Sequence, residues 1–289
     1  MKNLFIILWM GMMPVFAQSQ DNFLQKGSPL YHSLSLMHDF RFKEAKDYME
    51  KNKSTVRRGE YLFFHVNYYW WLYVISNDKK IYHDSLVNFL NQANEFYKKN
   101  NEERSYIALM TYGFDYRLAF KEDRFIDALR SAHKTARRIQ TSLDSAEYSP
   151  YYKLTAAIYL FSTGYGREKY WYLYPYFLTI PDGDIQKGLD YLRELSGHSN
   201  PVIATEASYV LMRIYRDVYE NYSKAYKESK KLVQVHPDNL FYLALHLQHR
   251  DKTGLLTPQD ITNYRNKYQH TDFINDASKN FFKNWRNIR

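Results

Sequence analysis

The chain has 289 residues, of which 45% are hydrophobic and 25% charged, enough to bury a sizeable core and too apolar for whole-chain disorder. The absence of cysteine excludes disulfides, thiol chemistry, cysteine-ligated zinc and a cysteine-linked lipid anchor. The formal charge is +9, but the basic residues are scattered over helix-compatible segments, which favours solvated helix faces over nucleic-acid binding. Ten glycines and eight prolines are too few for the frequent turns of a sandwich or barrel, so long helices fit better.

The first 17 residues have the pattern of a secretory signal peptide. Lys2 provides a positive start, residues 4–16 form a short apolar stretch, and Ala17 ends a small-residue cleavage site. Cleavage after Ala17 would remove one lysine and no acid, which lowers the formal charge from +9 to 9 − 1 = +8. We therefore expect a periplasmic or secreted protein without a transmembrane segment after signal cleavage; a retained N-terminal anchor is the alternative.

A repeat of about 40 residues organises the rest of the chain. A large apolar residue is followed three positions later by a small one, which lets a neighbouring helix approach closely. One interval is about 20 residues longer than the others, and it contains Gly164 to Pro181, predicted to be an insertion or an extra helix. The pairs are Phe42/Ala45, Tyr82/Ser85, Phe125/Ala128, Ile185/Gly188 and Tyr222/Ala225.

Each pair follows a strongly apolar stretch, as expected for helices with neighbours on two sides. The second helices, such as Ile126 to Thr141 and Ser223 to Val235, are more amphipathic. We expect about six helix hairpins that contact mainly their neighbours, with essentially no β-structure, over residues 18–271. Residues 272–289 are expected to form a capping helix. The apolar stretches are Glu60 to Ser76, Glu102 to Phe120, Ser149 to Ser162 and Pro201 to Tyr219.

The segment from Tyr219 to Ala225, with Pro237 twelve residues after that alanine, resembles a tetratricopeptide repeat. The segments Asp123 to Ala128 and Asp39 to Ala45 match the same pattern without the closing proline. The stretch from Gly164 to Asn239 is also similar to the divergent tetratricopeptide proteins of the inclusion-body clearance type. This resemblance implies an α-α superhelix of stacked hairpins, a tetratricopeptide-like solenoid, whose first helices line a concave binding surface.

Motifs for chemistry are weak in this sequence. His246 and His249 have metal-ligand spacing on a helix, but no acid at a helical interval completes a site, so we interpret them as surface or interface residues. Asp182 to Asp184 lacks the further ligands of a calcium loop and is interpreted as a turn with Asp184 as helix cap. Thr257 is expected to cap a later helix. We expect no catalytic residues, no metal and no cofactor.

The sequence therefore predicts a non-catalytic exported scaffold that binds a protein or peptide in envelope assembly or transport. A glycan-binding module that stacks sugars on exposed tyrosine and tryptophan is one alternative, and a helical-toroid glycosidase is another. Aromatic rings and arginine in a groove suit an acidic or aromatic peptide and also suit sugar stacking. The predicted partner-binding residues are Tyr69, Trp70, Tyr112, Tyr116, Arg117, Tyr170, Trp171 and Tyr174.

Overall fold

The computed structural model describes residues 26–76 and 80–287, and the predicted signal peptide lies outside them. Every regular element within these ranges is helical and none is a strand, which confirms the expected all-α fold class. None of the helices described combines the length and the apolarity needed to cross a membrane.

In the described part of the chain, twelve helices pair as six hairpins, the number predicted from the sequence. The first helices of the hairpins are α2 (Pro29–His38), α4 (Arg58–Ile75), α6 (Tyr106–Lys121), α9 (Pro150–Lys169), α12 (Pro201–Arg213) and α14 (Leu240–Lys252). Their partners are α3 (Phe42–Lys51), α5 (Lys80–Lys99), α7 (Phe125–Ala136), α11 (Ile185–Leu195), α13 (Tyr222–Val235) and α15 (Pro258–His270).

Short helical segments complete the chain. The π-helix η3 continues α12 without a break, and α16 and η4 replace the single capping helix expected over residues 272–289. Phe282 and Trp285 of this end are buried, and the two segments that carry them pack on α14 of the last hairpin. The short segments are α8 (Gln140–Ser145), η2 (Trp171–Leu173), α10 (Tyr174–Phe177), η3 (Ile214–Val218), α16 (Asp276–Phe282) and η4 (Trp285–Asn287).

Side-chain caps fix several helix starts where the sequence predicts them. The Asp184 carboxylate accepts the backbone N–H of Lys187 at 2.9 Å and begins α11. Thr257 and Asp260 form a reciprocal capping box at the start of α15, followed by Pro258 at the first helical position. Both predicted caps are confirmed.

Four of the five small residues of the repeat are buried at the contact between the two helices of a hairpin, whereas Ser85 of α5 is only half-buried. Ala45, Ala128 and Ala225 are buried near the starts of α3, α7 and α13. Gly188 of α11 faces α9 so closely that an added methyl carbon would come within 2.7 Å of the Phe161 backbone nitrogen. The repeat pattern therefore marks the second helix of the first five hairpins, and at the four buried positions the close approach needs a small side chain.

The predicted insertion begins later than the sequence suggests. Residues 164–169 continue α9 to Lys169, so the extra segment between the hairpin helices covers residues 170–184. Phe177 and Ile180 of this segment are buried against Ala136 of α7. Their packing fixes the segment to the body of the protein.

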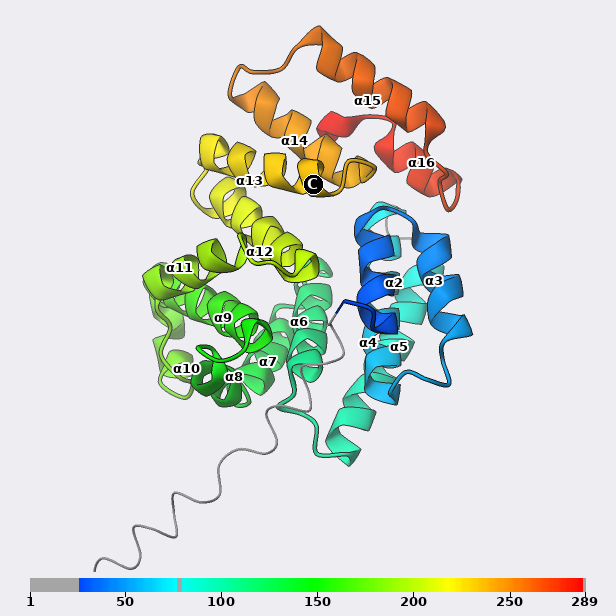
Figure 1. The fold of residues 1–289 in the computed structure, drawn as a ribbon. Helices are drawn as coiled ribbons and strands as arrows, with labels where there is room; N and C mark the ends of the chain where they lie inside the picture. Colours follow the sequence, from blue (N-terminus) through cyan, green and yellow to red (C-terminus); the bar gives the residue numbers. More distant parts are fainter. Residues whose placement is uncertain (1–25, 77–79, 288–289) are drawn as a thin grey trace, which may run out of the picture.

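The hairpins do not contact only their neighbours, which corrects the expectation of a simple stacked array. Figure 1 shows the first hairpin, α2 and α3, next to the C-terminal helix α16. The side-chain amide of Asn239 on α14's N-terminus donates to the backbone carbonyl of His38 at 2.7 Å. The rings of Phe40 and Phe282 lie 5.3 Å apart. The first and last parts of the described chain therefore share one core.

We predict that Gly188→Ala destabilises the protein by about 1–3 kcal/mol, because α9 and α11 would have to separate. The added methyl would meet backbone atoms of Phe161 and Ala157, at 2.7 and 2.8 Å. Gly197→Ala is a matched control, since its methyl would meet only the Glu194 carbonyl oxygen at 3.6 Å. Urea unfolding of both variants checks this; equal stability would contradict the close approach.

Four buried histidines make stability depend on pH. Burial is the main cause that lowers the pKa of His38 and His249 to about 3, and of His65 and His246 to about 4. A histidine in an unfolded chain has a pKa of about 6.5, so the unfolded state binds more protons as the pH falls below that value. Their contribution is therefore fully present above about pH 6.5 and is lost as the pH falls towards the folded-state values.

Between pH 7 and pH 5 we expect a loss of about 2 kcal/mol in unfolding free energy for each of these histidines. Urea unfolding at pH 7, 6 and 5 measures the loss, and His249→Gln should flatten the dependence by about one histidine's share. A free energy that stays constant over this range would show that these histidines can be protonated in the folded state.

Candidate functional site

The predicted residues on α4 differ in what they contact. The Tyr69 ring stacks on Phe89 of α5 at 5.4 Å, so it belongs to the interface within its own hairpin. The half-buried Trp70 packs on Phe114 of α6, with 5.8 Å between ring centres. Trp70 therefore lies at the junction of α4 and α6, and Tyr69 does not.

Tyr112 does not offer its ring to a partner, which corrects the sequence prediction. Its side chain is only 1% exposed. Lys134 of α7 and Arg138, two residues after that helix, cover the ring, with their charged groups 4.4 and 5.7 Å from its centre. The ring fills the contact between α6 and α7, as aromatic residues of a first helix do when they point towards the hairpin partner.

Tyr116 and Arg117, near the C-terminal end of α6, are both accessible to solvent. The Arg117 guanidinium lies 5.1 Å from the centre of the Phe114 ring, which is a cation–π contact. Among the described residues, no carboxylate oxygen lies within 4 Å of the Arg117 nitrogens. Burial raises the pKa of Tyr116, and the nearby hydroxyl of Tyr170 raises it further. Tyr116 is therefore close to the segment that follows α9.

The segment after α9 carries the most exposed apolar side chains among the predicted residues. We call Tyr170, Trp171, Tyr172, Tyr174 and Leu178 the 170–178 cluster. Trp171 is 78% exposed and Tyr174 60% exposed. The sequence prediction that these rings are too closely spaced to face one core is confirmed by this exposure.

Anchors on the opposite side hold the cluster in place. Gly166 of α9 lets the Phe177 ring approach, since an added methyl would lie 3.1 Å from that ring. Arg167 donates to the Phe177 carbonyl oxygen at 2.6 Å and forms an ion pair with Asp182. The Tyr159 hydroxyl donates to the Pro181 carbonyl oxygen at 2.6 Å. The segment is therefore fixed by Phe177, while the rings of Tyr170, Trp171, Tyr172 and Tyr174 are exposed.

One half-buried acidic residue of α12 was missed by sequence reasoning. Glu206 of α12 keeps 25% of its side-chain surface exposed, with the Nε2 atom of His38 3.5 Å from one oxygen. Burial raises the pKa of Glu206, and the charge of Arg117 opposes this effect. Because burial lowers the pKa of His38 to about 3, His38 is neutral at pH 7 and does not compensate the carboxylate. No local sequence signal marks this acid.

Aromatic rings lie beside Glu206. Tyr209 follows it by one helical turn, and its ring lies 5.9 Å from the ring of Trp71 on α4. Arg213 donates to the Tyr209 hydroxyl at 3.2 Å and is held by Asp217 at 2.5 Å. We call the surface formed by Trp70, Arg117, Glu206 and Tyr209 the inner surface.

A chain of acid, histidine and hydroxyl lies near Glu206 but is closed to substrates. His236 contacts the Asp39 carboxylate through Nδ1 and the Thr205 hydroxyl through Nε2, each at 2.7 Å. Thr205 and His236 are buried. The cavity lined by His38 and Trp71 next to this chain has about 10 Å³, room for one water at most. These three hydrogen-bonded side chains therefore join helices and are not open to a substrate.

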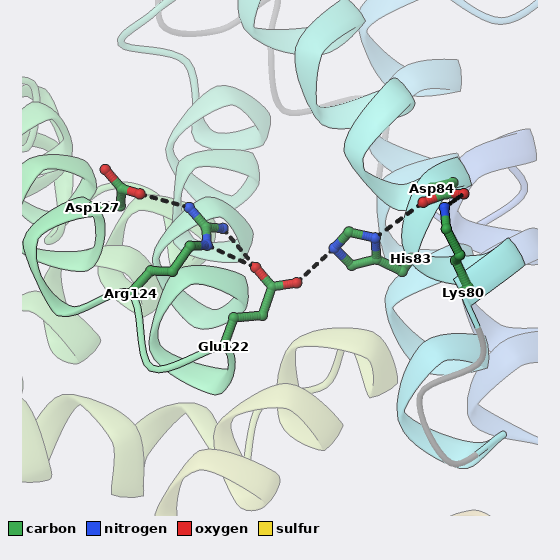
Figure 2. A network of polar contacts seen from close by, with 6 residues as sticks. All are labelled: Lys80, His83, Asp84, Glu122, Arg124 and Asp127. Atoms are coloured by element: carbon green, nitrogen blue, oxygen red, sulfur yellow. Dashed lines mark hydrogen bonds and ion pairs between the residues drawn. The ribbon is translucent and has the colours of Figure 1, made fainter.

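A second polar network connects neighbouring hairpins (Figure 2). His83 of α5 contacts Glu122, which follows α6, through Nε2 at 2.6 Å. Arg124 then links Glu122 to Asp127 of α7, with both distances 2.8 Å. Within the described ranges, no group of three or more histidine, cysteine, aspartate or glutamate residues is placed to hold a metal. Because positive and negative groups alternate along it, this network connects the two hairpins.

His246 and His249 of α14 are buried, and each ring lies 3.0 Å from the Ser229 hydroxyl of α13. They therefore lie at the interface between these two helices.

No family model, no curated protein and no solved structure matches this chain. Two accessible surfaces emerge, the 170–178 cluster and the inner surface, and Tyr116 lies between them.

Proposed function

We propose that this protein is a non-catalytic exported scaffold that binds a protein or peptide partner in envelope assembly or transport. The exposed 170–178 cluster is the observation that carries the proposal. Export itself rests on the predicted signal peptide, and the tetratricopeptide-like superhelix rests on the hairpins and on the resemblance of residues 219–237.

The exposed rings of the 170–178 cluster support binding because they contribute little to the stability of the fold. Phe177 and Ile180 already anchor the segment, while Trp171 and Tyr174 expose most of their surface. Contiguous exposed apolar side chains are uncommon on monomeric proteins unless they contact a partner. Tyrosine and tryptophan also supply large contact area with few rotatable bonds, and for this reason they dominate binding hot spots.

Positive charge near the cluster favours a partner with acidic groups. The Lys169 ammonium lies 5.8 Å from the Tyr170 ring centre and 2.9 Å from the Tyr165 hydroxyl. The formal charge of the whole chain is +9. Such a surface attracts an acidic protein or peptide over long range and adds specificity at contact.

Glycan binding is the second candidate, because the exposed face of the Trp171 indole could also stack on a sugar ring. A neutral oligosaccharide would bind without dependence on the basic residues, whereas an acidic peptide would bind more weakly as the salt concentration rises. Salt dependence therefore separates the two candidates.

The first step of the test is to find a partner at the cluster. A photo-crosslinking amino acid replaces Trp171, and crosslinking is done in the native envelope. Tyr148 is the matched control position, since it is 89% exposed and precedes α9, about 30 Å from the end of that helix. We expect a protein product from position 171 that position 148 does not give.

The second step measures the affinity of the purified partner. Trp171→Ala with Tyr174→Ala should weaken binding at least tenfold, because two exposed rings are removed. The same double variant should melt within about 2 °C of the parent protein, since neither ring fills the core. An unchanged dissociation constant, or weaker binding that only follows a loss of folded protein, would contradict the proposal. Binding of a neutral glycan instead of a protein would support the second candidate.

A further inference from the structure

Helices α6 and α12 both pack against the tryptophans of α4, through Phe114 of α6 and Tyr209 of α12. One stripe of residues on α6 carries the groups that interact electrostatically with Glu206 of α12. Tyr106, Met110, Gly113 and Arg117 are spaced by four, three and four residues, so they share one face of the helix. Both ends of the stripe are electrostatically linked to Glu206. Arg117 lowers the pKa of Glu206, and the pKa of Tyr106 is raised by burial first and by Glu206 second.

Gly113, in the middle of this stripe, has no packing reason to be glycine. A methyl carbon added at Gly113 would meet no atom within 4 Å, apart from the helix's own backbone. At Gly59, Gly164 and Gly188, by contrast, an added methyl would press on neighbouring atoms at 3.2 Å or less. A glycine inside a helix costs about 1 kcal/mol relative to alanine. Glycine at position 113 therefore lowers the stability of α6, and packing within the protein does not explain why it is there.

The two charged groups beside this space are opposite in sign and do not neutralise each other by contact. In the part of the chain that the structure describes, no ion pair within 4 Å joins Arg117 to Glu206. Arg117 is held on the Phe114 ring, and the Glu206 carboxylate lies 3.5 Å from Nε2 of the neutral His38. A carboxylate that has lost part of its hydration gains from a bound cation, and a free guanidinium fork binds a carboxylate in two places.

We propose that the space over Gly113, between α6 and α12, binds an extended peptide segment that gives a carboxylate to Arg117 and a lysine ammonium to Glu206. Glycine lets the peptide main chain approach the helix closely. Alternate residues of an extended chain point to the same side, so the two charges belong two residues apart. This inference rests on the proposed peptide-binding function and deepens it. Tyr116 connects the space to the 170–178 cluster, so one partner can reach both surfaces.

Capped pentapeptides are the probes for this site. The test peptide is acetyl-Ala-Lys-Ala-Asp-Ala-amide, and the reference replaces lysine by norleucine and aspartate by asparagine. Titrations follow the indole N–H signals of Trp70 and Trp71 by NMR, because both residues lie on α4 beside the inner surface. We expect the charged peptide to bind at least tenfold more tightly than the neutral one.

The decisive variant is Gly113→Ala. It should weaken binding of the charged peptide at least tenfold, because the methyl occupies the space that the main chain needs. It should also raise the melting temperature by about 2 °C, because alanine is the better helix former. Loss of binding in a more stable protein cannot be attributed to unfolding. Gly197→Ala, at the end of α11, is the control and should leave binding unchanged.

Charge-neutralising variants assign the two contacts. Glu206→Gln should remove the preference for lysine over norleucine, and Arg117→Gln the preference for aspartate over asparagine. The inference is overturned if no charged peptide binds, if Gly113→Ala binds as tightly as the parent protein, or if both preferences survive these variants. A partner that depends on Trp171 but not on Gly113 would leave the proposed function standing and remove this inference alone.

Discussion

The rest of the structure depends on the buried polar contact between the first hairpin and the C-terminal half of the chain. The Tyr242 hydroxyl lies 3.1 Å from Nδ1 of His38, and Asn239 donates to the His38 carbonyl oxygen. Asp39 contacts His236 at 2.7 Å. Each of these groups gives up its hydration when the hairpin docks and finds its partner only in this arrangement, and a packing that left such a group buried but unpaired would cost about 1–3 kcal/mol for that group. The contact therefore selects one arrangement of the hairpins over an extended row.

This closure also determines the chemistry of the inner surface. His38 lies behind Glu206 only because the first hairpin returns to α12, and burial at that contact keeps His38 neutral. The same packing brings Trp71 of α4 against Tyr209 of α12. An open array would leave Glu206 hydrated, and its carboxylate would then gain little from binding an ammonium group. Folding and the proposed recognition thus depend on one interface.

Local features of the fold could be predicted from the sequence, whereas the site could be predicted only in part. Caps such as Asp184 depend on residues near in sequence, and the close approach at Gly188 is indicated by its place in the repeat. The exposure of Trp171 also follows from local crowding of rings. The prediction that Tyr112 binds a partner was wrong. An aromatic residue of a first helix can point either to the inner surface or to its hairpin partner, and a helical pattern does not distinguish the two. Glu206 could not be found, because its environment is made by residues distant in the chain.

The closure is the central claim, and the distance between its two sides tests it most directly. The chain has no cysteine, so spin labels can be placed uniquely at Lys43→Cys on α3 and Lys279→Cys on α16, both exposed positions. Double electron–electron resonance in frozen solution should give a single narrow distance distribution at the short end of the measurable range. A broad distribution that extends to long distances would show that the first hairpin and the C-terminal helices move independently, and it would contradict the account.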